Sequence, residues 1–156
     1  MSGRGSVVSI HLARAGGAPV EEVAEARAVA GKGLDGDRYS NGSGTYSKPR
    51  HDPAAEATLI ESEALDALKR DHAIELAPGA SRRNITTRGI ALNDLIGREF
   101  TVGAVRLRGI RLCEPCAHLQ NLTHAGVMRG LAHRGGLNAE ILTDGVIRVG
   151  DVIEAK

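Results

Sequence analysis

Aromatic side chains are nearly missing from this sequence, which has no tryptophan, one phenylalanine and two tyrosines among 156 residues. Stacking platforms for nucleobases are built from exposed aromatic rings, so the composition argues against base recognition. The net charge is +1, from 20 basic and 19 acidic residues, which gives no excess to attract nucleic acid or an anionic membrane surface. We therefore expect no nucleic-acid partner, no membrane partner and an aliphatic core.

Long apolar runs and a cysteine framework are also lacking. No stretch approaches the roughly 18–20 apolar residues that cross a bilayer, and Met1–Gly5 lacks the apolar segment of a signal peptide. Two cysteines are too few for a disulfide scaffold. We expect a cytoplasmic protein with reduced thiols, folded as a single domain over residues 1–156.

Glycine, in contrast, is abundant at 20 residues, many of them in short groups between apolar segments. Alternation predicts a strand over residues 6–13 with Val8, Ile10 and Leu12 on one face. An Asp144-Gly145 pair between apolar runs predicts a hairpin, and Ser62 is placed to cap a helix. Further strands are predicted over residues 20–29, 57–60, 82–87, 100–102 and 105–112. The pattern favours a mainly β fold with a few helices, closed or nearly closed as a barrel.

The two cysteines flank Glu114 and Pro115. Proline suits the first position of a helix, which places Cys116 in the first turn, where unpaired N–H groups and the helix dipole favour negative charge. A cysteine so placed has a lowered pKa and forms a thiolate near neutral pH. We predict that Cys116 is the catalytic residue and acts as nucleophile, metal ligand or persulfide carrier. Cys113, in an apolar strand, is expected to be buried and inert.

Two other interpretations of these cysteines stay open. A redox Cys-x-x-Cys motif sits between the strand and helix of a βαβ unit, and the sequence predicts no such unit here. A structural zinc site would combine both cysteines with His118 and either His124 or His133, although the spacing matches no familiar zinc finger. These histidines are also candidates to line the Cys116 site.

A second group of polar residues is Arg82, Arg83 and Asn84. Arginine presents a planar fork of donors that fits phosphate, and asparagine adds a donor and an acceptor. On a strand, Arg82 and Asn84 would share one face and grip an anion together. The alternative is a solvated strand end with ordinary surface charge.

A glycine-rich turn spans Gly33–Tyr39 and contains Gly36, Asp37 and Arg38. Glycine lets backbone N–H groups approach a phosphate or a planar ring. The turn lacks the Gly-Lys-Ser/Thr ending of a Walker loop, so it predicts no nucleotide-triphosphate site.

Taken together, five segments resemble MOSC domains, which occur at the C-terminus of molybdenum cofactor sulfurases, as stand-alone bacterial proteins and in amidoxime-reducing enzymes. The resemblance covers nearly the whole chain, and its specificity lies in the order of the segments. They are Gly33-Leu34-Asp35-Gly36-Asp37-Arg38, Thr58-Leu59-Ile60-Glu61-Ser62-Glu63, Arg82-Arg83-Asn84-Ile85, Pro115-Cys116-Ala117-His118-Leu119 and Gly145-Val146-Ile147-Arg148-Val149-Gly150-Asp151.

The resemblance implies a barrel-like MOSC fold around a pterin-bound molybdenum cofactor (molybdopterin) or a site that holds sulfide as a persulfide. It implies that Cys116 ligates molybdenum or holds sulfur. The implied cofactor-binding residues are Arg82, Arg83, Asn84, Gly36, Asp37, Arg38 and His118. Two positions depart from relatives: Tyr39 stands where many have histidine, and Arg83 stands where the reductases tend to have proline.

Two functions follow from this resemblance. In the first, a molybdenum-dependent oxidoreductase reduces small N-hydroxylated compounds, with electrons from a redox partner because the sequence has no flavin or iron–sulfur motif. In the second, the chain is a non-enzymatic module that carries sulfur or cofactor to an acceptor protein. Pyridoxal phosphate is not expected as a cofactor.

Overall fold

The structure is a computed structural model that describes residues 3–42, 44, 52–114, 119, 123 and 126–156. Most of the regular structure in these ranges is short strands. They are β1 (Arg4–Ala13), β2 (Val20–Val23), β3 (Glu25–Val29), β4 (Gly33–Leu34), β5 (Ala57–Glu61), β6 (Ile85–Arg88), β7 (Glu99–Val102), β8 (Val105–Leu112), β9 (Leu137–Ile141), β10 (Gly145–Arg148) and β11 (Val152–Ala155).

Helices in the same ranges are few and mostly short. They are the α-helices α1 (Arg38–Asn41), α2 (Ser62–His72) and α4 (Val127–Gly130) and the 3-10 turns η1 (Pro53–Ala55), η2 (Pro78–Ser81) and η3 (Leu92–Leu95). The longest, α2, has 11 residues, and none of the described helices combines the length and apolar character needed to cross a membrane.

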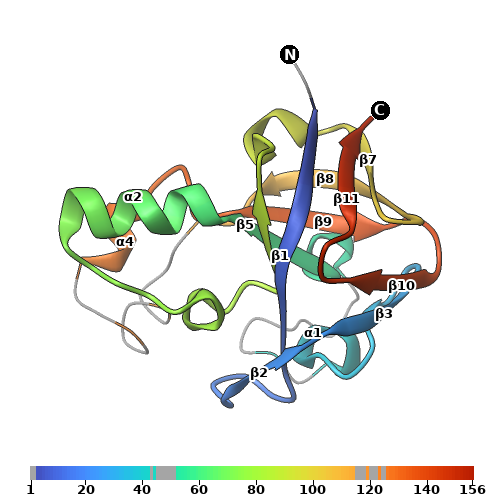
Figure 1. The fold of residues 1–156 in the computed structure, drawn as a ribbon. Helices are drawn as coiled ribbons and strands as arrows, with labels where there is room; N and C mark the ends of the chain where they lie inside the picture. The colour runs from blue at the N-terminus through green and yellow to red at the C-terminus, as the bar shows by residue number, and fades with distance from the viewer. Residues whose placement is uncertain (1–2, 43, 45–51, 115–118, 120–122, 124–125) are drawn as a thin grey trace.

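Seven strands form a closed barrel in the order β11-β7-β8-β9-β5-β6-β1, and the pairing of β1 with β11 closes it (Figure 1). The mainly β, barrel-like fold predicted from the sequence is therefore confirmed. Strand β1 pairs with β11 through Arg4–Ser6 and with β2 through Ile10–Ala13. In Figure 1 both termini lie at one end of the barrel, whereas β2, β3 and α1 lie at the other.

A β-bulge in β1 changes the face that was predicted to be buried. The register against β6 shifts between Val7 and Ser9. An extra residue in one strand turns the following side chains to the other face. As a result Val7 is 2% exposed and Val8 is 39% exposed, so the predicted shared face of Val8, Ile10 and Leu12 is wrong at Val8.

Among the described residues, the hydrophobic core of the barrel is aliphatic apart from the ring of Phe100, which is fully buried. A second, smaller cluster lies between the barrel wall and the helices α2 and α4, and includes Ile60, Leu68 and Leu131. Branched aliphatic side chains fill both clusters, as the scarcity of aromatic residues predicts, and burial of such side chains is the main favourable term in folding.

Two neighbouring strands of the barrel run parallel, and a helix connects them, which the sequence did not predict. Strands β5 and β6 run parallel and α2 joins them, which makes a βαβ unit. This unit is not at the cysteines, because Cys113 follows β8. Helix α2 begins at Ser62, its N-cap is Glu61, and no side-chain hydrogen bond caps it, so the predicted Ser62 cap is wrong. The Glu61 carboxylate instead accepts from the backbone N–H of Leu92 at 3.1 Å.

The predicted hairpin at Asp144-Gly145 is also wrong. Strand β9 pairs with β5 and β8, whereas β10 leaves the barrel and pairs with β3 in a three-stranded sheet of order β10-β3-β4. The Asp144 carboxylate accepts from the backbone N–H of Ala30 at 2.7 Å, which fixes the turn against the β3 end. A long-range pairing thus overrides the local turn signal.

Gly109 allows the η3 loop to lie against β8. Its N–H donates to the Arg98 carbonyl at 3.0 Å, and its carbonyl accepts from Gly97 at 2.8 Å. A Cβ at position 109 would collide with the backbone carbonyl of Leu95. Gly109→Ala is expected to lower the free energy of unfolding by about 3 kcal/mol, as overpacking of this kind does, measured by urea denaturation.

Gly97→Ala is the matched control for that change. Gly97 has φ +75° and nothing within 4 Å of an added Cβ, so alanine there meets only backbone strain, about 1 kcal/mol. Equal losses in the two variants would contradict a collision at position 109.

Candidate ligand-binding site

Asp37 anchors the glycine-rich turn to the end of β1. Its carboxylate is 1% exposed. It accepts from the N–H of Ala13 at 3.1 Å, from Arg38 Nη1 at 3.0 Å and, as N-cap of α1, from the N–H of Tyr39 at 3.3 Å. Gly36, which precedes it, has φ +88°, a conformation that favours glycine. The turn predicted from the sequence is thus a rigid corner of the fold.

Arg38 connects this corner to Arg82. Its side chain is 8% exposed, and Nη2 donates to the carbonyl of Arg82 at 3.0 Å. The guanidinium also lies over the Tyr39 ring, 4.7 Å from its centroid, within cation–π range. The structure therefore brings two of the predicted elements together, the Gly-Asp-Arg turn and the Arg82–Asn84 segment.

The strand predicted over residues 82–87 begins only at Ile85. Arg82 instead ends η2 in the left-handed conformation, with φ 62°, and its N–H donates to the Gly79 carbonyl at 3.0 Å. Because the chain is not extended here, Arg82 and Asn84 do not share a strand face, and that part of the prediction is wrong.

Asn84 is buried and its side chain contacts two strands. Its Oδ1 accepts from the N–H and the hydroxyl of Thr58 in β5, both at 3.1 Å, and its Nδ2 donates to the His11 carbonyl in β1 at 3.1 Å. The side chain thereby holds β1 and β5 together where neither pairs directly with the other.

Arg83 turns towards the segment that carries the predicted catalytic cysteine. Its Nε donates to the Gly135 carbonyl at 2.7 Å, and Nη2 donates to the carbonyls of Cys113 and Glu114 at 3.0 and 3.4 Å. Cys113 is partly exposed just beyond β8, so the expectation of a buried cysteine within a strand is wrong.

Other predicted site residues, Cys116 and His118, lie outside the described residues, as does His124. Their roles stay predictions. Among the residues that are described, no group of three or more histidine, cysteine, aspartate or glutamate side chains is placed to hold a metal ion. The zinc alternative is not tested by that finding, because it depends on Cys116 and His118.

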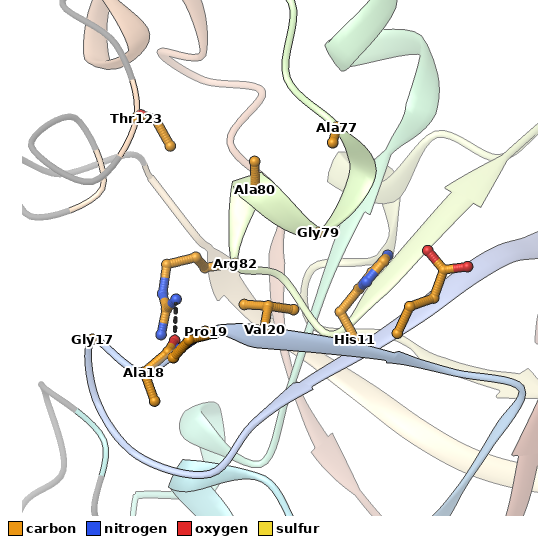
Figure 2. A pocket seen from close by; sticks show the side chains of 11 residues that line it. His11, Gly17, Ala18, Pro19, Val20, Ala77, Gly79, Ala80, Arg82 and Thr123 are labelled. Atoms are coloured by element: carbon orange, nitrogen blue, oxygen red, sulfur yellow. Dashed lines mark hydrogen bonds between the residues drawn. The ribbon is translucent and has the colours of Figure 1, made fainter.

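A cavity of about 460 Å³ lies between η2 on one side and β1, β2 and their connection on the other (Figure 2). Its volume falls within the range of small-molecule sites. Arg82 forms one wall and His11 lies at the opposite end, with mostly small or apolar residues between them. The lining residues are His11, Gly17, Ala18, Pro19, Val20, Glu22, Ala77, Gly79, Ala80, Arg82 and Thr123.

Arg82 lines this cavity with a guanidinium group whose hydrogen-bond donors are only partly paired among the described residues. Nη1 donates to the Ala18 carbonyl at 2.7 Å, whereas Nη2 is buried and has no hydrogen-bond partner within the described part of the chain. Burial, and then the nearby Arg38 guanidinium, lower the pKa of Arg82, although arginine stays charged in proteins. A buried donor without a partner is costly, so this wall suits an anionic oxygen.

His11 is a cavity residue that the sequence reasoning missed. It is 3% exposed, and its Nε2 lies 2.8 Å from the Ser9 hydroxyl. Burial lowers the pKa of His11, and the carboxylate of Glu22 opposes that shift. The available signal was a serine and a histidine inside an otherwise apolar strand. No local sequence pattern predicts that Gly79 packs against His11. In the structure, a Cβ added to Gly79 would lie 2.9 Å from His11 Nδ1.

The geometry defines the class of protein: a closed β-barrel with a ligand-sized cavity that has an arginine in one wall. The family model described as the MOSC domain matches residues 47–154. The chain belongs to the MOSC domain family. No curated protein sequence matches it.

Solved structures agree on the fold. The YuaD protein from Bacillus subtilis superimposes with a TM-score of 0.84 at 14% identity, covering 99% of this chain and 98% of that one. YiiM from Geobacillus stearothermophilus gives 0.71 at 15% identity, covering 97% and 75%. YiiM from Escherichia coli gives 0.69 at 17% identity, covering 98% and 69%. At such identities the likeness shows the fold alone.

The low pKa of His11 predicts a pH effect on stability. Below a pH of about 6.5, the ordinary pKa of histidine, the imidazole of His11 becomes protonated in the unfolded chain. Burial disfavours the same protonation in the folded protein. The free energy of unfolding therefore decreases as the pH falls from about 6.5 towards the pKa of the folded state. His11→Gln removes this titration. We expect the free energy of unfolding to fall less steeply in the variant between pH 7.5 and 5.5, measured by urea denaturation.

The groups that face His11 are Ser9 on its own strand, Glu22 on β2 and the η2 backbone at Gly79. The titratable one, Glu22, is present in both proteins, so the difference between the two pH profiles reports His11. Parallel profiles would contradict a buried, neutral imidazole.

Proposed function

We propose that this protein binds the molybdenum cofactor, with Cys116 as the molybdenum ligand, and reduces small N-hydroxylated compounds. One observation carries the proposal: Arg82 lines a ligand-sized cavity, and its buried Nη2 donor has no hydrogen-bond partner among the described residues. The adjacent Arg83 contacts the backbone two residues before Cys116. Membership of the MOSC family supports the choice of cofactor.

The residues fit such a group. Molybdopterin combines a phosphate with a flat pterin ring. The Nη2 group of Arg82 suits phosphate oxygens because guanidinium–phosphate hydrogen bonds are short and strong. The small and apolar side chains of Pro19, Val20 and Ala80 line the cavity beside it and leave room for a flat ring. Arg38 is paired with Asp37, so Arg82 itself supplies the positive charge for the anion.

Each of the other residues has a supporting part. Asp37 and Arg38 fix the Arg82 backbone, since Arg38 donates to the Arg82 carbonyl and to Asp37. Asn84 holds β1, and with it His11, against β5. We propose that Cys116, as a thiolate, supplies the sulfur ligand, and that His118 lines the same site.

When bound, the molybdenum cofactor supplies the two-electron chemistry that removes an oxygen atom from a substrate. Reduction of an N-hydroxyl group to N–H consumes two electrons and two protons and releases water. The sequence has no flavin or iron–sulfur motif, so the proposal includes a redox partner protein as the electron donor.

Substitution of Cys116 tests the ligand role directly. The protein is produced in cells that make the cofactor, and molybdenum is measured by elemental analysis and pterin by fluorescence. Cys116→Ala is expected to lose at least about tenfold in bound molybdenum, since removal of a ligand costs well over 1.4 kcal/mol. Cys113→Ala is the matched control and should retain most of the metal.

Equal molybdenum in wild type and Cys116→Ala would reject Cys116 as ligand. If wild type holds neither metal nor pterin but carries a persulfide on Cys116, the sulfur-carrier function predicted from the sequence replaces this one.

Arg82 provides an independent test of the cavity. Arg82→Gln removes the charge and the Nη2 donor, and a hydrogen bond to a charged group contributes about 1.5–3 kcal/mol. We expect about 10- to 100-fold weaker retention of pterin, measured after dialysis. Arg88→Gln is the control, because Arg88 is exposed and pairs with Asp66. Equal retention in the two variants would place the anion elsewhere.

A further inference from the structure

The cavity has a second polar end, away from Arg82. His11 in β1 and Glu22 in β2 are direct partners in an antiparallel pair, and both line the cavity. Side chains at such positions project from one face of the sheet, with their Cβ atoms about 4.5–5.5 Å apart. Burial lowers the pKa of His11 and the Glu22 carboxylate opposes that shift. Two polar side chains thus meet at the end of the cavity that lies opposite Arg82 (Figure 2).

The space in front of the His11 ring is kept open. Nε2 lies 2.8 Å from the Ser9 hydroxyl, whereas Nδ1 has no hydrogen-bond partner among the described residues. Nδ1 lies near Gly79, which also lines the cavity, and a Cβ added there would lie 2.9 Å from it. The backbone of Gly79 is not left-handed, so its conformation does not require glycine. The missing Cβ instead leaves room for a ligand beside the imidazole.

Glu22 brings an unpaired carboxylate to this end. Successive side chains of a strand point to opposite faces, so Val20 and Glu22 line the cavity and Glu21 does not. Glu21 pairs with Arg14 at 3.7 Å, whereas Glu22 has no basic partner within the described ranges. The Glu22 side chain is exposed. The two ends of the cavity therefore carry opposite charges, a guanidinium at Arg82 and a carboxylate at Glu22.

This charge distribution fits the two ends of a phosphorylated pterin. The phosphate suits the arginine. The 2-amino-4-oxo edge of the pterin ring presents two adjacent donors, N3–H and the 2-amino group. Two parallel N–H donors match the two oxygens of a carboxylate, as in bidentate arginine–carboxylate pairs. Between the two ends, Pro19 and Val20 offer apolar contact to the faces of the ring.

We propose that Glu22 selects the pterin ring: its carboxylate accepts hydrogen bonds from N3–H and the 2-amino group, at the end of the cavity opposite Arg82. This inference rests on the proposed function, in which the pterin lies in this cavity. It assigns a specificity-determining contact to a residue outside the motifs found in the sequence. The contact involves neither molybdenum nor Cys116.

Two matched probes test this contact. Pterin-6-ylmethyl phosphate carries both donors and a phosphate. Its lumazine counterpart has a 2-oxo group in place of the 2-amino group, so an acceptor oxygen would face the Glu22 carboxylate. Binding is measured by probe fluorescence near neutral pH, on the full chain purified from cells that cannot make the cofactor. Wild type is expected to bind the pterin probe about tenfold more tightly, because the lumazine probe loses a hydrogen bond to a charged group.

Three variants separate the contact from general charge effects. Glu22→Gln keeps the size of the side chain, and its amide N–H can donate to the 2-oxo group, so the preference for pterin should fall to about twofold or less. Glu21→Gln is the matched control, because it removes the same charge from the other face of β2, and it should keep the preference. Arg82→Gln should weaken both probes alike and leave their ratio unchanged.

The outcomes separate this inference from the proposed function. Equal binding of the two probes to wild type, or an undiminished preference in Glu22→Gln, would overturn the role of Glu22 alone. An equal loss of preference in Glu21→Gln and Glu22→Gln would replace the contact by a general charge effect. Failure of both probes to bind would overturn the placement of the ring in this cavity. The proposed function itself fails on a different measurement, the molybdenum content of wild type and Cys116→Ala.

Discussion

The hydrogen bonds of Asn84 are the constraint on which the site depends. One amide joins β1 to β5 across the barrel wall, through Thr58 on one side and His11 on the other. A buried amide is stable only when its donors and acceptors are matched. Its position therefore dictates where the two residues before it in the chain lie.

Those two residues point in different directions because the backbone leaves η2 in a left-handed turn. Arg82 reaches the cavity, and Arg83 reaches the carbonyls beside Cys113. Asn84 thus joins two strands, Arg82 lines the cavity, and Arg83 binds the backbone just before the predicted catalytic cysteine. Because the side chains of Arg82 and Arg83 point to different partners, their two positive charges are also kept apart. On one face they would repel each other.

Much of the fold could be predicted from the sequence, because strand alternation and glycine turns are local signals. The failures share one cause, which is a long-range contact that overrides a local preference. Val8 is exposed because β1 bulges against β6, and Asp144-Gly145 forms no hairpin because β10 pairs with β3. The order of short motifs identified the family, but it did not show that Arg82 and Asn84 face apart, nor that His11 lies in the cavity.

The pairing of β1 with β11 has a consequence for synthesis of the chain. The first and last strands are neighbours, so the barrel cannot close until residues 152–155 are available. Until then β1 and β7 each present an unpaired edge, and such edges favour aggregation. A nascent chain that has not yet reached β11 therefore holds the strands of residues 4–148 as an open sheet, and its tendency to aggregate depends on how quickly β11 is synthesised and pairs with β1.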